Sequence, residues 1–369
     1  MDHYSQRTRP PLSTRIRAAI LGAAVLVGVA ACTSSGKSGG AGSASTSASA
    51  TGSAQQPAVA VENEFVSTVH KTLPSVVEIT TSTGLGSGVI IDQRGDVVTN
   101  AHVVGTAKTF TVGLYGGKQL FHGSLVGVFA PDDLAVIRIQ GASNLQPITF
   151  GDSSKMQVGD IVMAIGNPLG LASSVTEGIV SATGRTVTEP AEANSPGATI
   201  PDAIQTSAAI NPGNSGGALV DLDGRLVGIP TLAAVDPQIG QGGSAAPGIG
   251  FAISANMAHN VATQLVSKGE VTNSGRAALG VTVATAVGPN GAPAGAAIVS
   301  VMPNGPAAKA GLRPGDVITR IDSFPITSTA SLADALANYA PGQTVHVTVI
   351  TDTGKVSTVT VQLGQLTGH

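Results

Sequence analysis

The chain has 369 residues, which is long enough for two domains and a sizeable core. Its formal net charge of −3 provides no basic surface, so we expect no nucleic-acid partner. Hydrophobic residues make up 42% of the chain and aromatic residues 3%, beside 48 glycines and 21 prolines. A core built mostly of Val, Ile, Leu and Ala, with many turns, favours short strands over a helical bundle.

Residues 1–31 are typical of an export signal, because arginines precede an apolar run at 18–31. That run is shorter than the about 20 residues of a spanning helix. It ends in Val-Ala-Ala-Cys, which resembles the lipobox of bacterial lipoproteins, so Cys32 is the predicted lipidation site. The alternative is an ordinary membrane anchor with an incidental cysteine. Either reading predicts an exported, membrane-attached protein on the extracytoplasmic side.

Cys32 is the only cysteine, so no intrachain disulfide can form. No cluster of Cys, His and carboxylates has metal-ligand spacing, and we expect neither a metal nor another cofactor. Residues 32–60 are mostly Ser, Gly, Ala and Thr, a composition that predicts a disordered tether. A short helix is expected next, over residues 62–72, with its apolar side chains on one face.

Residues 61–268 form the first predicted domain, in which short β-branched runs alternate with turn signals, as in β-barrels. Residues 188–201 contain Pro, Ala and Gly without a clear period and are interpreted as a long loop. Apolar residues at helical spacing predict a helix over 255–268, ended by Gly269.

A linker at 269–276 is followed by a second predicted domain, residues 277–365. It has strand-like runs at 279–283, 297–301 and 345–350. An amphipathic helix is predicted over 328–339, with Leu332 and Leu336 on one face. The expectation is a β-rich domain with two short helices.

The most informative motif is Gly-Asn-Ser-Gly-Gly at 213–217, which places Ser215 in a tight glycine-flanked turn. His102 and Asp133 lie upstream, and the order His, Asp, Ser is that of chymotrypsin-type hydrolases. The glycine-rich motif alone could be a plain β-turn. Asp132 competes with Asp133, since strand alternation would point the two to opposite sides. Ser153 is rejected because no glycines follow it.

Several runs, taken in order, resemble the HtrA/Deg family of serine proteases; they lie at 86–91, 98–104, 133–137, 158–160, 164–170, 208–217 and 248–253. The resemblance covers most of the chain from about residue 64 to 364. It implies an all-β-dominated fold, a chymotrypsin-like double β-barrel followed by a C-terminal PDZ domain (a β-sandwich with two helices). It also favours Asp133 over Asp132, through the match to Asp-Leu-Ala.

The resemblance implies that Ser215 is the nucleophile, His102 the general base and Asp133 its orienting partner. Backbone N–H groups of Gly213, Asn214 and Ser215 would form the oxyanion hole. Ala209 would lie at the base of the pocket for the side chain before the cut, with Ile210 beside it. Neither is charged, so small aliphatic residues are expected there.

Further residues are assigned through the family alone. Gly248, Ile249, Gly250 and Phe251 resemble a strand edge that pairs with an extended substrate backbone. Leu279, Gly280 and Val281 resemble the PDZ loop that holds a peptide's C-terminal carboxylate; the alternative is a packing module that binds nothing.

Regulation and assembly are also read from the family. Arg185 matches an arginine that senses activation, although a surface ion pair is the alternative. The segment near Phe65 resembles the part through which family members form homotrimers.

Two positions depart from the family's pattern. Ser207 stands where a carboxylate is usual, and Pro230 replaces an asparagine and removes a backbone donor, at what is expected to be a strand end. The function implied is a serine endopeptidase that cleaves unfolded or misfolded envelope proteins and binds C-terminal peptides at its PDZ domain. The alternatives are a chaperone or peptide-binding scaffold whose protease site is normally inactive, and a PDZ adaptor with a dead protease domain.

Overall fold

The computed structural model describes residues 56–82, 84–167, 174–189, 197–211, 213–235, 245–289 and 291–368. The predicted signal segment 1–31, Cys32 and the tether as far as residue 55 lie outside the described residues. Within these ranges no helix combines the length and the apolar character that crossing a membrane requires.

The first helix is longer than the sequence predicts. Helix α1 spans Gln56–Thr72 and therefore includes the last residues assigned to the tether. Phe65 and Val69 pack against the main hydrophobic core. A short 3-10 turn, η1 (Leu73–Ser75), leads from the helix into the first strand.

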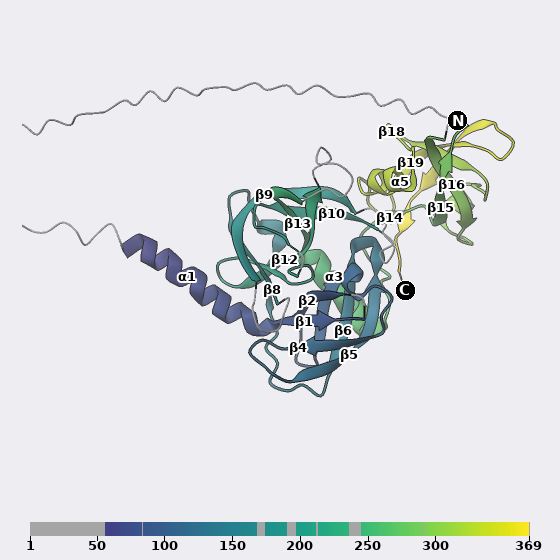
Figure 1. The fold of residues 1–369 in the computed structure, drawn as a ribbon. Coiled ribbons are helices and arrows are strands. Elements are labelled where there is room, and N and C mark those ends of the chain that lie inside the picture. Colours follow the sequence, from purple (N-terminus) through teal and green to yellow (C-terminus); the bar gives the residue numbers. More distant parts are fainter. Residues whose placement is uncertain are drawn as a thin grey trace, which may run out of the picture. The chain divides into compact units, whose positions relative to one another are not determined.

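Six strands form a closed first barrel in the order β1-β2-β3-β6-β5-β4 (Figure 1). They are β1 (Val76–Thr80), β2 (Leu85–Ile90), β3 (Asp96–Asn100), β4 (Thr109–Gly113), β5 (Leu120–Phe129) and β6 (Leu134–Gln140). Helix α2 (Ala101–Val104) follows β3, and the 3-10 turn η2 (Ala130–Asp132) joins β5 to β6. Fully buried Val and Ile side chains fill the interior, as the aromatic-poor composition leads one to expect.

The second barrel is a sheet in the order β11-β8-β9-β10-β13-β12-β7, closed by pairing of β11 with β12. Its strands are β7 (Thr149–Phe150), β8 (Ile161–Gly166), β9 (Ser174–Glu189), β10 (Ala198–Thr206), β11 (Ala218–Val220), β12 (Arg225–Val235) and β13 (Ala245–Ser254). The 3-10 turn η3 (Ser153–Lys155) follows β7. The double-barrel prediction is therefore confirmed.

The loop predicted over residues 188–201 is wrong at both ends, because its first and last residues belong to strands. Strand β9 continues to Glu189 and β10 begins at Ala198, and these two residues face each other in an antiparallel pair. The β-branched residues of the segment explain the difference, because Ile200 is fully buried in the barrel core while its neighbours pair with β9.

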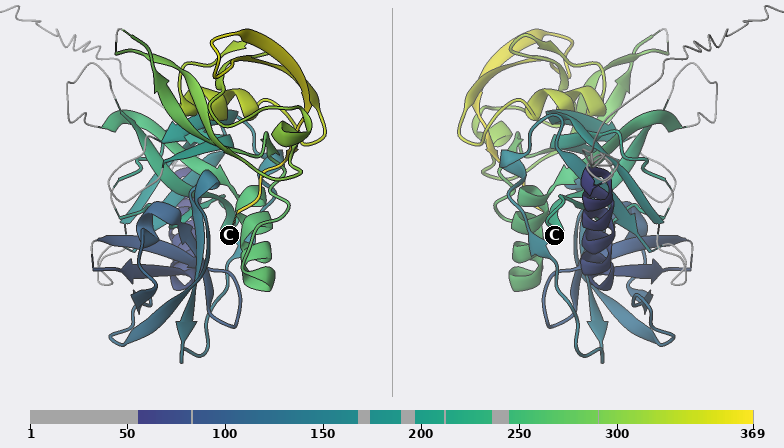
Figure 2. Two further views of the ribbon diagram at one scale, coloured as in Figure 1. Left: turned by 90° about the vertical axis from the view of Figure 1, so that its right-hand side faces the viewer. Right: turned by 90° about the vertical axis from the view of Figure 1, so that its left-hand side faces the viewer.

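Helix α3 spans Ala255–Lys268 as predicted, and Gly269 ends it in the left-handed conformation at φ 75°. Its buried face joins the core shared by the two barrels, where it contacts β5, β6 and β12. The helix, green in Figure 2, runs beside the strands of the first barrel in both views.

The C-terminal domain has a main sheet in the order β15-β16-β17-β19-β20, with β18 paired to β17. Its elements are β14 (Ala277–Ala278), β15 (Val281–Val287), β16 (Pro293–Val301), α4 (Pro306–Lys309), β17 (Val317–Ile321), β18 (Phe324–Pro325), α5 (Thr329–Leu336), β19 (Thr344–Ile350), β20 (Val356–Gln362) and β21 (Gly364–Gln365). Ser328 caps α5 through a reciprocal hydrogen-bond pair with Ser331, and Leu332 is buried in the domain's own core. Strand β21 pairs with β14, so the end of the domain lies against its beginning.

Candidate active site

His102 and Asp133 meet because β3 and β6 pair in register. Asn100 faces Leu134, so the residues that follow β3 lie beside those that precede β6. Asp133 ends the η2 turn in the left-handed conformation at φ 52°. Its Oδ2 lies 2.8 Å from His102 Nδ1, and its Oδ1 accepts from the His102 backbone N–H at 2.9 Å. The carboxylate thus fixes both the ring and the backbone of His102.

Thr231 completes this arrangement and was not found by sequence reasoning. Its hydroxyl donates to Asp133 Oδ2 at 2.6 Å, and its carbonyl oxygen accepts from Ser215 Oγ at 3.4 Å. Thr231 lies on β12 of the second barrel and is buried, so it links the histidine–aspartate pair to the serine. No motif marks this threonine, because its role depends on the register of β12 rather than on its neighbours in sequence.

Asp132 serves a different purpose from Asp133. The two side chains do point in different directions, but strand alternation is not the cause, because neither residue lies on a strand. The η2 turn directs them apart. Asp132 is fully buried and pairs with the guanidinium of Arg276, which also donates to the Pro131 carbonyl at 2.9 Å. Burial raises the pKa of Asp132 to about 6, although the charge of Arg276 acts in the opposite direction.

We expect Arg276→Gln to destabilise the protein at pH 8 by about 3 kcal/mol, and by far less at pH 5. Because the native pKa of Asp132 exceeds its unfolded value, stability falls as the pH rises through about 6. Without Arg276 that pKa rises further, so an uncompensated buried charge is formed only at the higher pH. Urea unfolding at the two pH values measures the difference. In the double variant Asp132→Asn/Arg276→Gln the destabilisation should no longer differ between the two pH values. If Arg276→Gln alone destabilises the protein equally at both pH values, buried charge on Asp132 is not the cause.

Ser215 lies in a turn that only glycines allow. Gly213 and Gly216 have φ values of 110° and 78°, and the Gly216 N–H donates to the Pro230 carbonyl at 2.9 Å. A Cβ atom on Gly216 would lie 2.4 Å from the Ser87 carbonyl oxygen, closer than atoms can approach. The turn that carries Ser215, residues 213–217, therefore packs directly on the first barrel, with no space for a side chain at residue 216.

The backbone N–H groups around Ser215 are not equivalent. The N–H of Asn214 donates to the Asn211 carbonyl at 3.1 Å, which leaves it unavailable to a substrate. For the N–H groups of Gly213 and Ser215, the described part of the chain contains no acceptor. Of the three predicted oxyanion-hole donors, the structure leaves these two open.

The predicted pocket residues lie close to the turn that carries Ser215. The Ala209 carbonyl accepts from Asn214 Nδ2 at 3.1 Å and from the Thr176 hydroxyl at 2.8 Å, and its side chain is exposed. Ile210 is buried against Gly250, where an added Cβ would lie 2.4 Å from the Ile210 side chain. Both side chains are uncharged, and only that of Ala209 is exposed.

The predicted free edge at 248–251 is wrong in its second half. Gly250 and Phe251 pair with β10 on one side and with β12 on the other, so they lie in an interior strand. The described register gives no strand partner to Gly248 or Ile249. The pattern Gly-Ile-Gly-Phe does not distinguish an edge strand from an interior one, because apolar residues of this kind occur in both types of strand.

Three further residues named from the family resemblance are Arg185, Ser207 and Pro230. Arg185 faces Ala203 between β9 and β10 and is exposed, and no ion pair of its side chain is found within the described ranges. The Ser207 hydroxyl accepts from the Ile179 N–H at 3.0 Å. Pro230 lies inside β12 rather than at a strand end, next to a register shift. Its carbonyl accepts the hydrogen bond from the Gly216 N–H.

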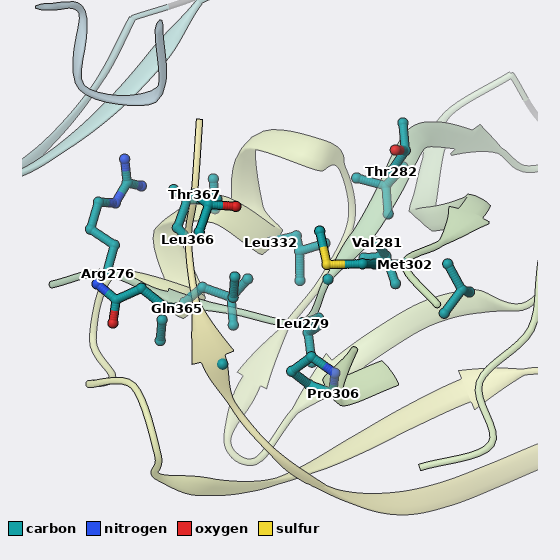
Figure 3. Close-up of a pocket in the computed structure, with 18 of the residues that line it drawn as sticks. Arg276, Leu279, Val281, Thr282, Met302, Pro306, Leu332, Gln365, Leu366 and Thr367 are labelled. Carbon is teal, nitrogen blue, oxygen red and sulfur yellow. The ribbon is translucent and has the colours of Figure 1, made fainter. Parts of the chain in front are cut away.

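The C-terminal domain has a groove of about 810 Å³, shown in Figure 3. Leu279, Gly280 and Val281 line it together with Leu332 and Leu336 of α5. Strand β15, which follows Gly280, is the terminal strand of its sheet. The groove therefore lies between an open strand edge and a helix. Among the residues the structure describes, no group of His, Cys, Asp or Glu is arranged to hold a metal ion.

Comparisons with known proteins agree with this architecture. Residues 86–229 match the model of a trypsin-like peptidase domain, and residues 276–363 match a PDZ domain. The chain is 41% identical over 312 residues to serine protease PepD of Mycobacterium tuberculosis, covering 80% of this chain and 65% of the relative. It is 42% identical over 285 residues to periplasmic serine endoprotease DegP of Escherichia coli, covering 76% and 57%. The chain thus spans somewhat less than two thirds of the length of these relatives.

A third relative, serine endoprotease DegS of Salmonella typhimurium, is 36% identical over 313 residues, and the alignment covers 84% of both chains. Among solved structures, the HtrA-type protease AlgW with a decapeptide has 33% identity and a TM-score of 0.53, covering 82% of this chain and 98% of that chain. With these matches and the two-barrel fold, the chain belongs to the HtrA/Deg family of trypsin-like serine proteases that carry a PDZ domain.

Proposed function

We propose that the protein is a serine endopeptidase that uses His102, Asp133 and Ser215. The observation that carries the proposal is the position of Thr231, whose hydroxyl bonds to Asp133 and whose carbonyl accepts from Ser215. One buried residue thus connects the nucleophile of the second barrel to the base and carboxylate of the first. Asp133 in turn bonds to the His102 ring, and a nucleophile, a base and an orienting carboxylate are the three groups that acyl transfer requires.

In this mechanism Ser215 Oγ attacks the substrate carbonyl while His102 removes its proton through the ring nitrogen that does not face Asp133. Asp133 holds the proton on Nδ1 and stabilises the charge that forms on the ring. The N–H groups of Gly213 and Ser215 receive the oxyanion. His102 then returns the proton to the leaving amine as the peptide C–N bond breaks, and water releases the acyl group by the same steps.

Substrates are proposed to be unfolded or misfolded proteins cut after small aliphatic residues. Exposed Ala209 and buried Ile210 present no charge that could select Lys or Arg. A substrate must also be extended to reach a serine in a turn that packs tightly on the neighbouring barrel. Folded segments cannot adopt that shape without local unfolding.

The PDZ groove is proposed to bind C-terminal peptides. The terminal position of β15 leaves one strand edge open for an added peptide strand. Leu279, Gly280 and Val281 begin this edge, and Gly280 has the positive φ of 71° that a tight carboxylate-holding loop favours. Arg185, exposed on β9, is retained as the proposed sensor of activation.

The protein is proposed to act outside the cytoplasm as a homotrimer. Several related proteins are named as periplasmic, and the sequence offers Cys32 as a site for a lipid anchor. On α1, Val59 and Val66 share one face at i, i+7 spacing and are each about half exposed, although Phe65 on the same helix packs inward. Such a helix face is better satisfied by another subunit than by water.

A scaffold function is the second candidate, favoured by the size of the PDZ groove. The test is to incubate the full chain with an unfolded model protein and with a fluorophosphonate, which reacts only with an activated serine. Cleavage that the reagent blocks, with its adduct mapped to Ser215 by mass spectrometry, supports the peptidase. Suppressed aggregation without cleavage or labelling would favour the scaffold.

A further inference from the structure

We propose that Ser87 is a positioning residue that holds the oxyanion loop in its working shape. Ser87 lies on β2 of the first barrel and is fully buried, yet its side chain contacts the loop that carries Ser215. No role was assigned to it from the sequence. The inference rests on the proposed peptidase function and adds a residue to it.

Two hydrogen bonds fix what the Ser87 hydroxyl does. Its Oγ lies 2.6 Å from the Gly213 carbonyl oxygen and 2.8 Å from the backbone nitrogen of Asn167. The Asn167 N–H can only donate, so the hydroxyl accepts from it. A hydroxyl has one hydrogen, which therefore points to the Gly213 carbonyl. The hydrogen bonds therefore run from the Asn167 N–H to the Ser87 hydroxyl, and from that hydroxyl to the Gly213 carbonyl.

The bond matters because of which peptide it holds. The peptide unit between Gly213 and Asn214 is held at its oxygen by Ser87 and at its nitrogen by the Asn211 carbonyl. The N–H groups of Gly213 and Ser215 belong to the peptide units on either side. Residue 213 is a glycine with φ 110°, and because it has no Cβ atom, little in its own structure restrains rotation of this peptide unit. The hydroxyl of Ser87 selects one orientation, in which the flanking N–H groups remain open.

The backbone of Ser87 supports the same loop. Its N–H donates to the Ser215 carbonyl at 3.0 Å, and its carbonyl accepts from the Thr99 hydroxyl at 2.6 Å. Side chain and backbone together thus hold the residues on both sides of Asn214. Because the backbone bonds persist when the side chain changes, substitution of Ser87 tests the hydroxyl bond alone.

The test is Ser87→Ala, which leaves a buried donor and a buried acceptor without partners. We expect kcat for a peptide substrate to fall about 100-fold, the effect of losing one oxyanion donor, while KM changes less than about threefold. The rate of fluorophosphonate labelling at Ser215 should fall in parallel. The acid limb of the pH–rate profile should not move, because His102 and Asp133 are untouched.

Ser254→Ala is the matched control, since Ser254 is equally buried and its hydroxyl has no partner within the described residues. It should retain the kcat of the parent. If Ser87→Ala does not fold, Ser87→Cys replaces it, because a thiol keeps a donor at this position but donates more weakly than a hydroxyl. An intermediate kcat supports the proposal; a kcat equal to that of the parent in either Ser87 variant overturns it. An inactive parent would instead refute the peptidase function.

Discussion

Replacing Ser215 by alanine will abolish proteolysis and leave the fold intact. By analogy with other serine proteases, kcat should fall by a factor on the order of 10⁶. Stability should change by less than about 1 kcal/mol, because the hydroxyl's bond to the Thr231 carbonyl is long, at 3.4 Å, and the backbone bond from Ser87 to the Ser215 carbonyl remains. Degradation of an unfolded protein, followed on a gel, measures the first effect and thermal unfolding the second.

The same variant separates the peptidase from the scaffold. Ser215→Ala should still bind unfolded chains and C-terminal peptides, because the PDZ groove shares no residue with the nucleophile turn. If the parent suppresses aggregation only through cleavage, the variant will lose that effect. Residual cleavage above about one per cent would mean that another residue is the nucleophile, and the proposed triad would be wrong.

Asp133→Asn should lower kcat about 10⁴-fold. The two carboxylate oxygens accept three hydrogen bonds, from the His102 backbone, the His102 ring and Thr231. An amide has only one oxygen, so in either orientation its NH2 group faces a donor. If it faces the His102 ring, the proton must move to the other ring nitrogen, and His102 can no longer accept from Ser215.

Asp132→Asn is the matched control for that experiment, because the two residues are adjacent and the substitution is the same. It should retain kcat within about tenfold, since the amide oxygen of the new side chain would still accept from Arg276 and no bond to His102 changes. Steady-state kinetics and thermal unfolding of both variants give the answer. A larger loss of kcat in Asp132→Asn than in Asp133→Asn would reverse their proposed roles.

The fold was predictable because its signals are local or belong to long motifs. Short β-branched runs between turns predicted the barrels, and helix α3 was recognised from its apolar spacing and from Gly269. The errors occurred where pairing partners decide the outcome. Residues 188–189 and 198–201 form two strand ends because they pair with the neighbouring strand, and Gly250 is interior because β10 and β12 lie on either side of it.

The site was predictable to a similar extent. His102, Asp133 and Ser215 could be singled out because each lies in a recognisable motif. Thr231 and Ser87 could not, since their roles come from hydrogen bonds across the two barrels, with hydroxyls that look ordinary in sequence. The sequence presents Asp132 only as an alternative to Asp133, and nothing in its sequence neighbourhood indicates a partner as remote as Arg276.

The absence of space at Gly216 has a consequence for how the proposed active site can change shape. An added methyl group there would meet both the Ser87 carbonyl and the Thr99 hydroxyl at 2.4 Å, so the two barrels touch backbone to backbone at the nucleophile. Such a contact cannot open gradually, because separating it breaks several buried hydrogen bonds at once. Any rearrangement at this site is therefore expected to occur by rotation of single peptide units, such as that between Gly213 and Asn214. A signal that reaches this site needs to move only a few atoms.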